Sequence, residues 1–386
     1  MELVSFLLPL IGALWWPFCR IMALFSTAPV IGEGLVPIPV RALLALVLLV
    51  AGEFHLLGKL FFGSMFSPEW PEPVMIAQGW LFGSIVMFAG LLLVRDVVAL
   101  LLKWLLRKRL PQTSSGVALM VVALVLSGIG VKQAIEIPAV RTVEVNFPDL
   151  PPAFEGFKIV QLTDIHASRL LPRAWVEQVV AKANRLNPDL VVLTGDMSDG
   201  TVDRRFKDVE PLSRLQAKSG LYAITGNHEY YFDYVGWMKI YRQLKIPFLQ
   251  NSHVRITRGD ESIVLAGVND EAAQRVEETG PDLEQALKGV RPDDSIILLD
   301  HRPGSAHDNA RHNVKLQLSG HTHGGMIRGL DLLVSPANNG FVSGRYQVGN
   351  MILYVSNGTG LWNGFPLRLG HPSEITELIL HRSAAR

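Results

Sequence analysis

Long apolar runs dominate about the first 140 residues of the chain and predict helices that cross a membrane. A helix needs roughly 20 apolar residues to span a bilayer, and the runs that approach this length cover residues 3–23, 42–62, 74–94 and 117–134. Arg20 interrupts the first run, and the second contains Glu53 and His55. An ionisable residue inside a span is a functional candidate, but a span that ends earlier would place both at the membrane interface, which is the interpretation we favour. We predict a transmembrane region of about four helices over residues 1–136.

Basic residues in the short loops predict how these helices are oriented. The loop between the third and fourth runs is basic, whereas residues 63–73 contain two glutamates and no Lys or Arg. Cytoplasmic loops carry the positive excess. With four spans, both termini and the C-terminal domain therefore lie on the extracytoplasmic side. A signal peptide is a poor alternative, because the N-terminus carries Glu2 and no basic residue, and further apolar runs follow.

The rest of the chain alternates short apolar runs with polar clusters, and this pattern predicts an α/β domain. Runs of four to six β-branched or Leu-rich residues are typical of buried strands; they cover residues 157–162, 190–193, 221–224, 295–299 and 314–318. Residues 173–186 have apolar positions at helical spacing and predict a crossover helix. Alternation of strands and helices indicates a layered α/β fold over residues 154–386. Residues 137–153 are predicted to be a proline-rich linker. Within it, polar and apolar side chains alternate at residues 142–145 as in a short edge strand, which places the start of folded structure near Arg141.

Composition excludes several kinds of site. The only cysteine is Cys19, so the chain has neither an intrachain disulfide nor a cysteine-based zinc site. The net charge is +1, and the basic block Arg107-Lys108-Arg109 sits beside an apolar run, where a topology signal explains it better than nucleic-acid binding. We therefore expect no nucleic-acid partner, and the sequence indicates no protein partner.

Polar residues follow each predicted strand, and their types are those of metal ligands. Ligands of α/β sheets bind beyond the carboxyl ends of the strands, so the fold would gather Asp164, His166, Asp196, Asn227, His228, His301, His321 and His323. Imidazole together with carboxylate favours Mn, Fe or Zn over Mg. Because the set is larger than one ion needs, we predict two divalent ions, which Asp196 could bridge. Gly195, Gly226 and Gly320 each precede a proposed ligand and would allow a close backbone approach.

These motifs differ in how strongly each predicts a metal site. Asp164-x-His166 and Gly195-Asp196 are common by chance, whereas Gly226-Asn227-His228-Glu229 and Gly320-His321-Thr322-His323 are more specific. Their shared order and position at strand ends make coincidence improbable. The remaining histidines of this domain lack such positions, and we predict that they are surface residues: His253, His307, His312, His371 and His381.

Taken together, these motifs resemble the full signature of calcineurin-like metallophosphoesterases, with Asp199 and His301 completing the set. The resemblance covers roughly residues 154–380, and the preceding spans look like a membrane-bound bacterial branch of that family, in an inner or plasma membrane. It implies a four-layered α/β/β/α sandwich. It implies that Asp164, His166, Asp196 and His323 hold one ion and that Asp196, Asn227, His301 and His321 hold the other. It also implies that His228 contacts the phosphate or protonates the leaving oxygen, with Asp199 orienting it, during hydrolysis without a covalent enzyme intermediate.

The substrate is less constrained than the chemistry. Membrane tethering favours a phosphate ester on a lipid or an envelope precursor, while a nucleotide or protein phosphatase keeps the same chemistry with another substrate. A receptor that binds metal or phosphate without turnover is a different class, which is disfavoured because it has no need of His228 and Asp199.

Aromatic residues near the motifs, such as Tyr231, Trp237, Trp362 and Phe365, are predicted to line the pocket, but Tyr231 and Trp237 fit the core of the next helix equally well.

Overall fold

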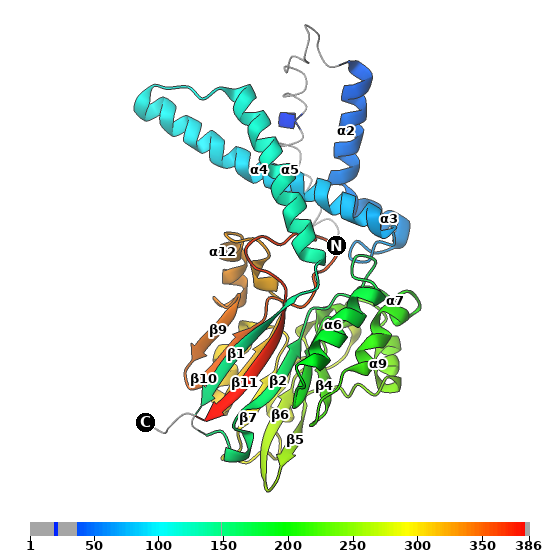
Figure 1. Cartoon of the computed structure of the whole chain (residues 1–386), viewed down its shortest axis with the longest axis vertical. Helices are drawn as coiled ribbons and strands as arrows, with labels where there is room; N and C mark the ends of the chain where they lie inside the picture. Colours follow the sequence, from blue (N-terminus) through cyan, green and yellow to red (C-terminus); the bar gives the residue numbers. More distant parts are fainter. Residues whose placement is uncertain (1–18, 22–36, 148, 383–386) are drawn as a thin grey trace. The chain divides into compact units, whose positions relative to one another are not determined.

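The chain forms two compact units in the structure, a computed structural model that describes residues 19–21, 37–147 and 149–382 (Figure 1). Unit 1 comprises Met1–Gln133 together with Gly364–Leu367, and unit 2 comprises Ala134–Asn363 with Arg368–Arg386. The predicted span over residues 3–23 lies almost wholly outside the described residues.

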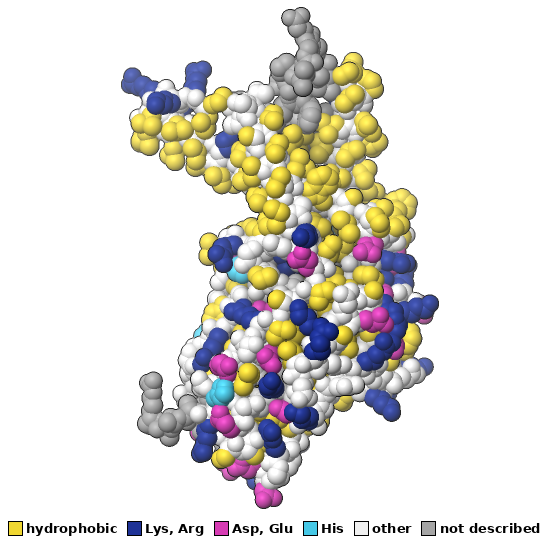
Figure 2. Space-filling model, in the orientation of Figure 1, with side chains coloured by type: hydrophobic (Ala, Val, Ile, Leu, Met, Phe, Trp, Pro, Cys, Tyr) yellow, Lys and Arg dark blue, Asp and Glu magenta, His cyan; other side chains and the backbone are white. Residues whose placement is uncertain are grey.

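Unit 1 is built from apolar helices. The helices named in its described part are α2 (Ile38–Gly52), α3 (Phe54–Phe62), α4 (Glu72–Leu106) and most of α5 (Gln112–Ile135). In the described part of the chain, α4 and residues Thr113–Ile135 are long and apolar enough to cross a membrane. Yellow apolar side chains cover the helices of this unit in Figure 2. Their outward-facing leucines and valines suit a lipid environment, where no polar surface is needed.

The second predicted span is broken in the structure. Residues 42–62 fall within α2 and α3, which are bent by 67° at Glu53 and together form a broken span or a re-entrant loop. Gly63 ends α3 in a left-handed conformation that glycine adopts without steric cost. The third predicted span, residues 74–94, continues as one helix to Leu106. Asp96, just after the apolar stretch of α4, forms an ion pair at 2.7 Å with Arg20. Arg20, which interrupts the first apolar run of the sequence, therefore has a charged partner.

A tetrapeptide from late in the sequence, Gly364–Leu367, completes unit 1. The His55 imidazole Nε2 donates a hydrogen bond of 2.7 Å to the carbonyl oxygen of Gly364, and His55 is buried. A Cβ atom on Gly79 of α4 would lie 2.6 Å from Pro366 Cγ, so the proline fills the space that this glycine leaves. The predicted pocket residue Phe365 instead packs edge-to-face against Phe82, with ring centroids 5.9 Å apart. Phe365 is therefore a packing residue of unit 1.

Unit 2 contains two mixed β-sheets. The first has the order β1-β11-β2-β3-β4, formed by β1 (Ala139–Phe147), β11 (Glu374–Arg382), β2 (Phe157–Leu162), β3 (Leu190–Thr194) and β4 (Leu221–Ile224). The second has the order β5-β6-β7-β8-β10-β9, formed by β5 (Ser252–Arg258), β6 (Glu261–Gly267), β7 (Ile296–Leu299), β8 (Val314–Ser319), β10 (Met351–Val355) and β9 (Gly344–Val348). The predicted strands are β2, β3, β4, β7 and β8. β2, β3 and β4 are parallel to one another in the first sheet, and β7 and β8 are parallel to each other in the second.

Three apolar cores hold the sheets and helices in four layers. Between the sheets, side chains such as Ile159 of β2 and Leu265 of β6 are fully buried. The outer face of the first sheet is covered by α6 (Arg173–Arg185), α7 (Val202–Val209) and α9 (Tyr234–Gln243). The outer face of the second sheet packs against short helices, including α10 (Leu283–Ala286) and α11 (Ala306–Asn309). The layers are α/β/β/α, as the family resemblance implied.

The segment predicted as a linker, residues 137–153, is part of this sandwich. β1 pairs with β11 in parallel over its whole length, from Ala139 opposite Glu374 to Phe147 opposite Arg382. The alternation at residues 142–145 was thus a correct indication of an edge strand, and the linker prediction was wrong for residues 139–147. β1 belongs to the sandwich because one of its faces buries Val145 in the core between the sheets.

Asp294 is a buried ionic link between β5 and the start of β7, and its removal is expected to destabilise unit 2. Its carboxylate is 2% exposed and accepts hydrogen bonds of 2.8 and 2.6 Å from the guanidinium of Arg255. These bonds, against the opposing effect of burial, lower the pKa of Asp294. Asp294→Asn should cost about 1–3 kcal/mol at neutral pH, measured as a lower melting temperature of the full chain in detergent.

The pH dependence of that loss follows from the direction of the pKa shift. A carboxylate whose folded pKa is depressed contributes fully above its unfolded pKa, about 3.9, and the contribution fades as the pH falls toward the folded pKa. The difference between wild type and variant should be constant above about pH 5 and narrow below about pH 4. Asp293→Asn, at a neighbouring carboxyl that is 82% exposed, is the matched control. Equal melting of both variants at pH 7 would contradict the prediction.

Candidate metal centre

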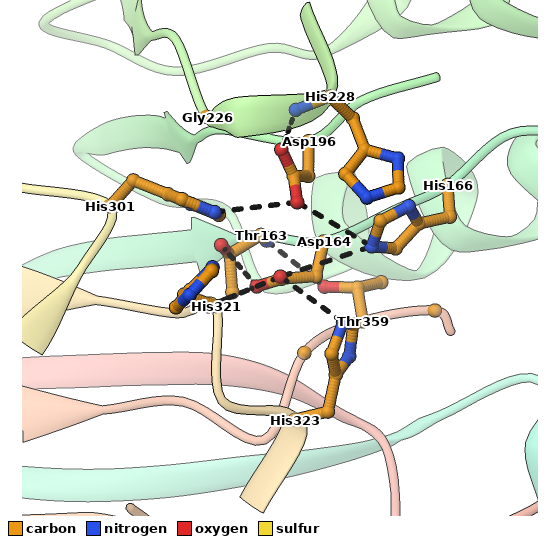
Figure 3. Close-up of polar contacts among 12 residues, drawn as sticks. Thr163, Asp164, His166, Asp196, Gly226, His228, His301, His321, His323 and Thr359 are labelled. Atoms are coloured by element: carbon orange, nitrogen blue, oxygen red, sulfur yellow. Dashed lines mark hydrogen bonds and ion pairs between the residues drawn. The ribbon is translucent and has the colours of Figure 1, made fainter. Parts of the chain in front are cut away.

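The proposed ligands lie in the loops that follow five strands. Asp164 and His166 follow β2, Asp196 and Asp199 follow β3, Asn227 and His228 open α8 (Asn227–Tyr231) after β4, and His301 follows β7. His321 and His323 follow β8, where His323 begins the 3-10 turn η6 (His323–Gly325). Figure 3 shows that the labelled side chains from these loops point toward one another. Residues spread over some 160 sequence positions thus meet at one end of the sandwich.

Two aspartates lie at the centre of the cluster. Asp196 Oδ2 is 3.3 Å from His301 Nε2 and 3.7 Å from His166 Nε2. Asp164 Oδ1 is 3.5 Å from His323 Nε2 and 3.9 Å from His166 Nε2. Three groups of potential ligands overlap through these residues: Asp164–His166–His323, His166–Asp196–His228 and Asp164–Asp196–His301.

His321 is held differently from the other proposed ligands. It belongs to none of the three groups, which were drawn from the described residues. Its backbone N–H lies 3.1 Å from both carboxylate oxygens of Asp164, and its ring centroid is 5.1 Å from that of His301. The guanidinium of Arg302 lies 3.3 Å from His321 Nε2 and also pairs with Asp270 at 2.7 Å. Arg302, which the sequence reasoning did not single out, therefore brings a positive charge next to the cluster.

Hydrogen bonds from the outer ring nitrogens orient the histidines. His301 Nδ1 donates to the carbonyl oxygen of Thr194 at 2.7 Å, which turns Nε2 toward Asp196. His166 Nδ1 and His228 Nδ1 both donate to Asp199 Oδ1, at 2.9 and 2.6 Å. A carboxylate or carbonyl behind a ligand histidine fixes its ring and tautomer. Asp199 does this for two rings, whereas the sequence had suggested it only for His228.

Electrostatics in this buried cluster favour a charged His228–Asp199 pair. Burial disfavours the imidazolium of His228, but Asp196 and Asp199 outweigh it and raise its pKa to about 9. Burial likewise opposes the carboxylate of Asp199, but His166 and His228 outweigh it and lower its pKa. The pair thus carries opposite charges in a site that excludes bulk water.

Several proposed ligands have a left-handed backbone, which is sterically costly for residues other than glycine. The angle φ is 51° at Asp164, 48° at His166, 55° at Asp196, 70° at His321 and 51° at His323. Each such residue costs of order 1 kcal/mol or more and persists only where its surroundings fix it. Here the loops after β2 and β3 are bonded side by side, as Asp164 N–H donates to Gly195 O and His166 N–H donates to Asp196 O, both at 3.0 Å. Strain of this kind clusters at functional sites.

At two of the three predicted glycines, Gly226 and Gly320, the structure leaves no space for a side chain. A Cβ atom on Gly226 would collide with the Asp196 carboxylate, and one on Gly320 would collide with that of Asp164. Gly226 also donates its backbone N–H to Glu229 at 2.7 Å. The glycines therefore let the loops close around the two aspartates.

Two buried charged residues support these loops, and the sequence reasoning gave neither this role. Glu229 accepts hydrogen bonds from the backbone N–H groups of Asp196, Met197 and Gly226, at 2.9, 2.8 and 2.7 Å. Arg368 is fully buried and donates to the carbonyl oxygens of His323, Asn357, Gly360 and His371, at distances of 2.6–3.1 Å. Glu229 lay inside a recognised motif, so it could have been found; Arg368 stands out only as a lone basic residue in an apolar segment.

The predicted pocket aromatics divide into different environments. Trp237 is 1% exposed in the core beneath the first sheet, where its indole N–H donates to Gly200 O at 2.8 Å. Tyr231 is half-buried with its ring centroid 5.2 Å from that of His228. Of these two, only Tyr231 lies beside the cluster. Among the histidines predicted at the surface, His307 and His312 are exposed, whereas His253, His371 and His381 are half-buried. His253 Nδ1 donates to Ala286 O at 2.6 Å.

The donor set fits divalent cations. The buried polar atoms without a hydrogen-bond partner among the residues that the structure describes include His166 Nε2, His301 Nε2 and Asn227 Oδ1. Buried polar atoms without a partner are uncommon and need an explanation such as an ion. All three belong to the proposed ligand set, and two buried carboxylates stand beside them. Imidazole with carboxylate is a typical environment for Mn, Fe or Zn.

Comparison with known proteins agrees with this geometry. The family model of calcineurin-like phosphoesterases matches residues 157–325. An uncharacterized metallophosphoesterase of Campylobacter jejuni is 33% identical over 267 residues, covering 68% of this chain and 68% of that protein. One of Bacillus subtilis is 32% identical over 243 residues, covering 60% of this chain and 81% of that protein. The chain belongs to the calcineurin-like metallophosphoesterase family.

Relatives in animals extend the comparison to membrane proteins. A "transmembrane protein with metallophosphoesterase domain" of Bos taurus is 41% identical over 271 residues, covering 67% of this chain and 61% of that protein. The chain spans 61–62% of the length of this relative and of a similarly named one in Danio rerio. Relatives occur in both bacteria and animals, so the resemblance extends beyond the bacterial branch. The names of these relatives agree with the two candidate spans of unit 1.

Proposed function

We propose that the chain is a membrane-bound enzyme that hydrolyses a phosphate ester with the help of two divalent cations. The observation that carries this proposal is the overlap of the three ligand groups through Asp164, His166 and Asp196. Asp164, His166, Asp196 and His323 would hold one ion. Asp196, Asn227, His301 and His321 would hold the other. When bound, a pair of such ions lowers the pKa of water and neutralises charge that develops on a phosphoryl group.

The chain's own residues position the substrate and handle the proton. His228 Nδ1 is engaged by Asp199, so its Nε2 is the atom available to donate a proton to the leaving oxygen. Its backbone N–H donates to Asp196 Oδ1 at 2.8 Å, which fixes the histidine relative to the ligand set. Asp199 keeps the ring in this orientation and stabilises its positive charge. A site that only binds metal or phosphate has no need of this pair, so its presence supports an enzyme.

The orientation in the membrane follows from the loop before α5. Arg107, Lys108 and Arg109 lie between α4 and α5 and are exposed. A basic loop favours the cytoplasmic side, and α5 then carries the chain across the bilayer. Unit 2 would lie on the extracytoplasmic side of a multi-pass protein.

Chelation and metal replacement test the proposed chemistry. The full chain, purified in detergent, would be assayed with an aryl phosphomonoester and an aryl phosphodiester before and after removal of metal. Chelation should lower the rate by about a hundredfold or more, and Mn, Zn or Fe(II) should restore it better than Mg. Metal analysis of the active protein should give about two ions per chain. Absence of turnover with every ion and ester, or a rate that chelation does not change, would overturn the proposal.

A further inference from the structure

The exposed apolar side chains of unit 2 are unevenly distributed. Five large apolar residues in the described part of this unit are well exposed: Phe206, Val235, Val276, Leu332 and Leu333. The most exposed are Val235 at 78%, Leu333 at 77% and Leu332 at 73%. Single exposed apolar residues are ordinary, so their arrangement matters more than their presence. Leu332 and Leu333 are adjacent on the short helix α12 (Asp331–Val334).

All five residues lie in segments that follow the carboxyl end of a strand. Phe206 is in α7 after β3, and Val235 is in α9 after β4 and α8. Val276 ends the 3-10 segment η3 (Glu271–Val276) after β6, while Leu332 and Leu333 follow β8. Because β3 is parallel to β4 and β6 to β8 through β7, these segments begin at the same end of the sandwich as the ligand loops. The apolar residues therefore lie in segments that begin at the end that holds the proposed metal centre, and we call them the apolar rim.

The chain also enters unit 2 at this end. β1 runs parallel to β11, which is antiparallel to β2, so the start of β1 lies beside the carboxyl end of β2. The last residues of the apolar helix α5, Ala134 and Ile135, belong to unit 2. Beyond them, Lys182 Nζ donates to Pro138 O at 2.6 Å, which fixes the start of the strand. The attachment to the membrane-spanning region and the apolar rim thus share one end of the domain.

Basic side chains accompany the apolar ones. Arg169, in the loop after β2, and Arg328, between η6 and α12, are both exposed. α12 packs directly against η6, since Asp331 Cα would lie 2.5 Å from a Cβ on Gly325. Apolar side chains next to Lys or Arg are typical of protein surfaces that enter the headgroup region of a bilayer. The combination distinguishes this end from a purely apolar contact face.

We propose that the apolar rim enters the bilayer interface and that the site takes the phosphate ester of a membrane lipid. The rim would dip about 5–10 Å into the headgroup region, at the depth where lipid phosphates lie. The substrate class would be an amphiphile with an acyl or isoprenoid chain. This inference rests on the proposed hydrolase function and adds to it the membrane surface as partner and the lipid as substrate.

Site-specific labelling tests the contact with lipid. Cys19 is the only native cysteine, so Cys19→Ser provides a background for Leu333→Cys carrying an environment-sensitive fluorophore. In phosphatidylcholine vesicles with spin-labelled lipid, the label at 333 should be quenched by a shallow spin label. The control is Asp260→Cys in the exposed turn between β5 and β6, at the opposite end of the sandwich; this label should not be quenched. Equal quenching at the two positions would overturn the proposal. It would also be overturned if the fluorophore at 333 became shielded from water in detergent to an extent that depends on protein concentration, because this would show that the rim contacts a second copy of the chain.

Kinetics of a double variant test the substrate class. Leu332→Ser with Leu333→Ser should lower hydrolysis of lipid phosphate esters in vesicles by about tenfold or more, while turnover of a soluble aryl phosphate stays unchanged. Phosphatidic acid, phosphatidylglycerol and an isoprenyl diphosphate would serve as lipid substrates. Hydrolysis of the aryl ester without release from any of these lipids would overturn the lipid assignment but leave the hydrolase function intact. Lipid quenching at 333 in a protein without any hydrolase activity would overturn the function but leave the membrane contact.

Discussion

Asp196→Asn is expected to lower the hydrolysis of an aryl phosphate ester by at least about a thousandfold. Asp196 is 2% exposed, and its Oδ2 lies between His301 Nε2 and His166 Nε2, the position required of a carboxylate that serves both proposed ions. An amide of the same shape keeps the packing but removes the negative charge. It also replaces one oxygen ligand with an NH₂ group that cannot bind a cation. We expect the variant to lose metal as well as activity.

Turnover and metal content of the purified variant, with its melting temperature, check this prediction. Asp203→Asn is the matched control, because Asp203 is an exposed aspartate in α7 of the same unit. It should retain wild-type activity and metal. If Asp196→Asn melts like the wild type, binds two ions and turns over normally, Asp196 does not bridge a metal pair and the assignment of the centre is wrong.

His228→Ala is expected to lower kcat by about 10²–10⁴-fold without loss of metal. The bond that fixes its loop to Asp196 comes from the backbone N–H, so the substitution leaves it in place. The substitution removes the proposed proton donor, whose Nδ1 donates a hydrogen bond of 2.6 Å to Asp199 Oδ1. The loss should depend on the ester: a nitrophenyl group leaves readily as an anion, whereas an alkyl alcohol needs a proton. An alkyl ester should therefore lose considerably more rate than the nitrophenyl ester.

The comparison of esters separates the proton-donor role from alternatives. His228 also lies within ligand distance of His166 and Asp196. If His228 were a metal ligand, the variant would lose metal and both esters would lose rate alike. The exposed His312, substituted to Ala, is the control for a general effect of removing a histidine. Equal losses for the two esters would contradict the proposed role.

Much of the fold and the site could be predicted because the sequence repeats one local pattern. Each of the five predicted strands is a short apolar run, and each is followed by a polar cluster. The bounds of β2 and β4 agree with the prediction, and α6 differs from it by one residue. Since parallel strands present their carboxyl ends at one edge, the proposed ligands could be expected to meet there from the sequence alone.

Other features had no such local signal. Strands β5 with β6 and β9 with β10 are antiparallel pairs of consecutive strands, and β11 completes the first sheet through long-range pairing, such as Glu374 opposite Ala139. The left-handed conformations of Asp164 and Asp196 arise from bonds between neighbouring loops. Residue type alone predicts such a conformation for glycine but not for these positions. Arg368 is another case, because a single arginine gives no indication that four carbonyl oxygens will surround it.

The path of Gly364–Leu367 has a consequence for dissecting the protein. This tetrapeptide packs against Phe82 and Gly79, although the residues on either side of it belong to unit 2. A truncated chain that starts at Ala134 would retain every proposed ligand but leave Phe365, Pro366 and Leu367 without their packing partners. It would also leave this apolar loop attached directly to Arg368, whose bonds to His323 O and Gly360 O shape the ligand loops. Unit 2 is therefore not a self-contained module, and its boundary cannot be drawn at a single cut in the chain.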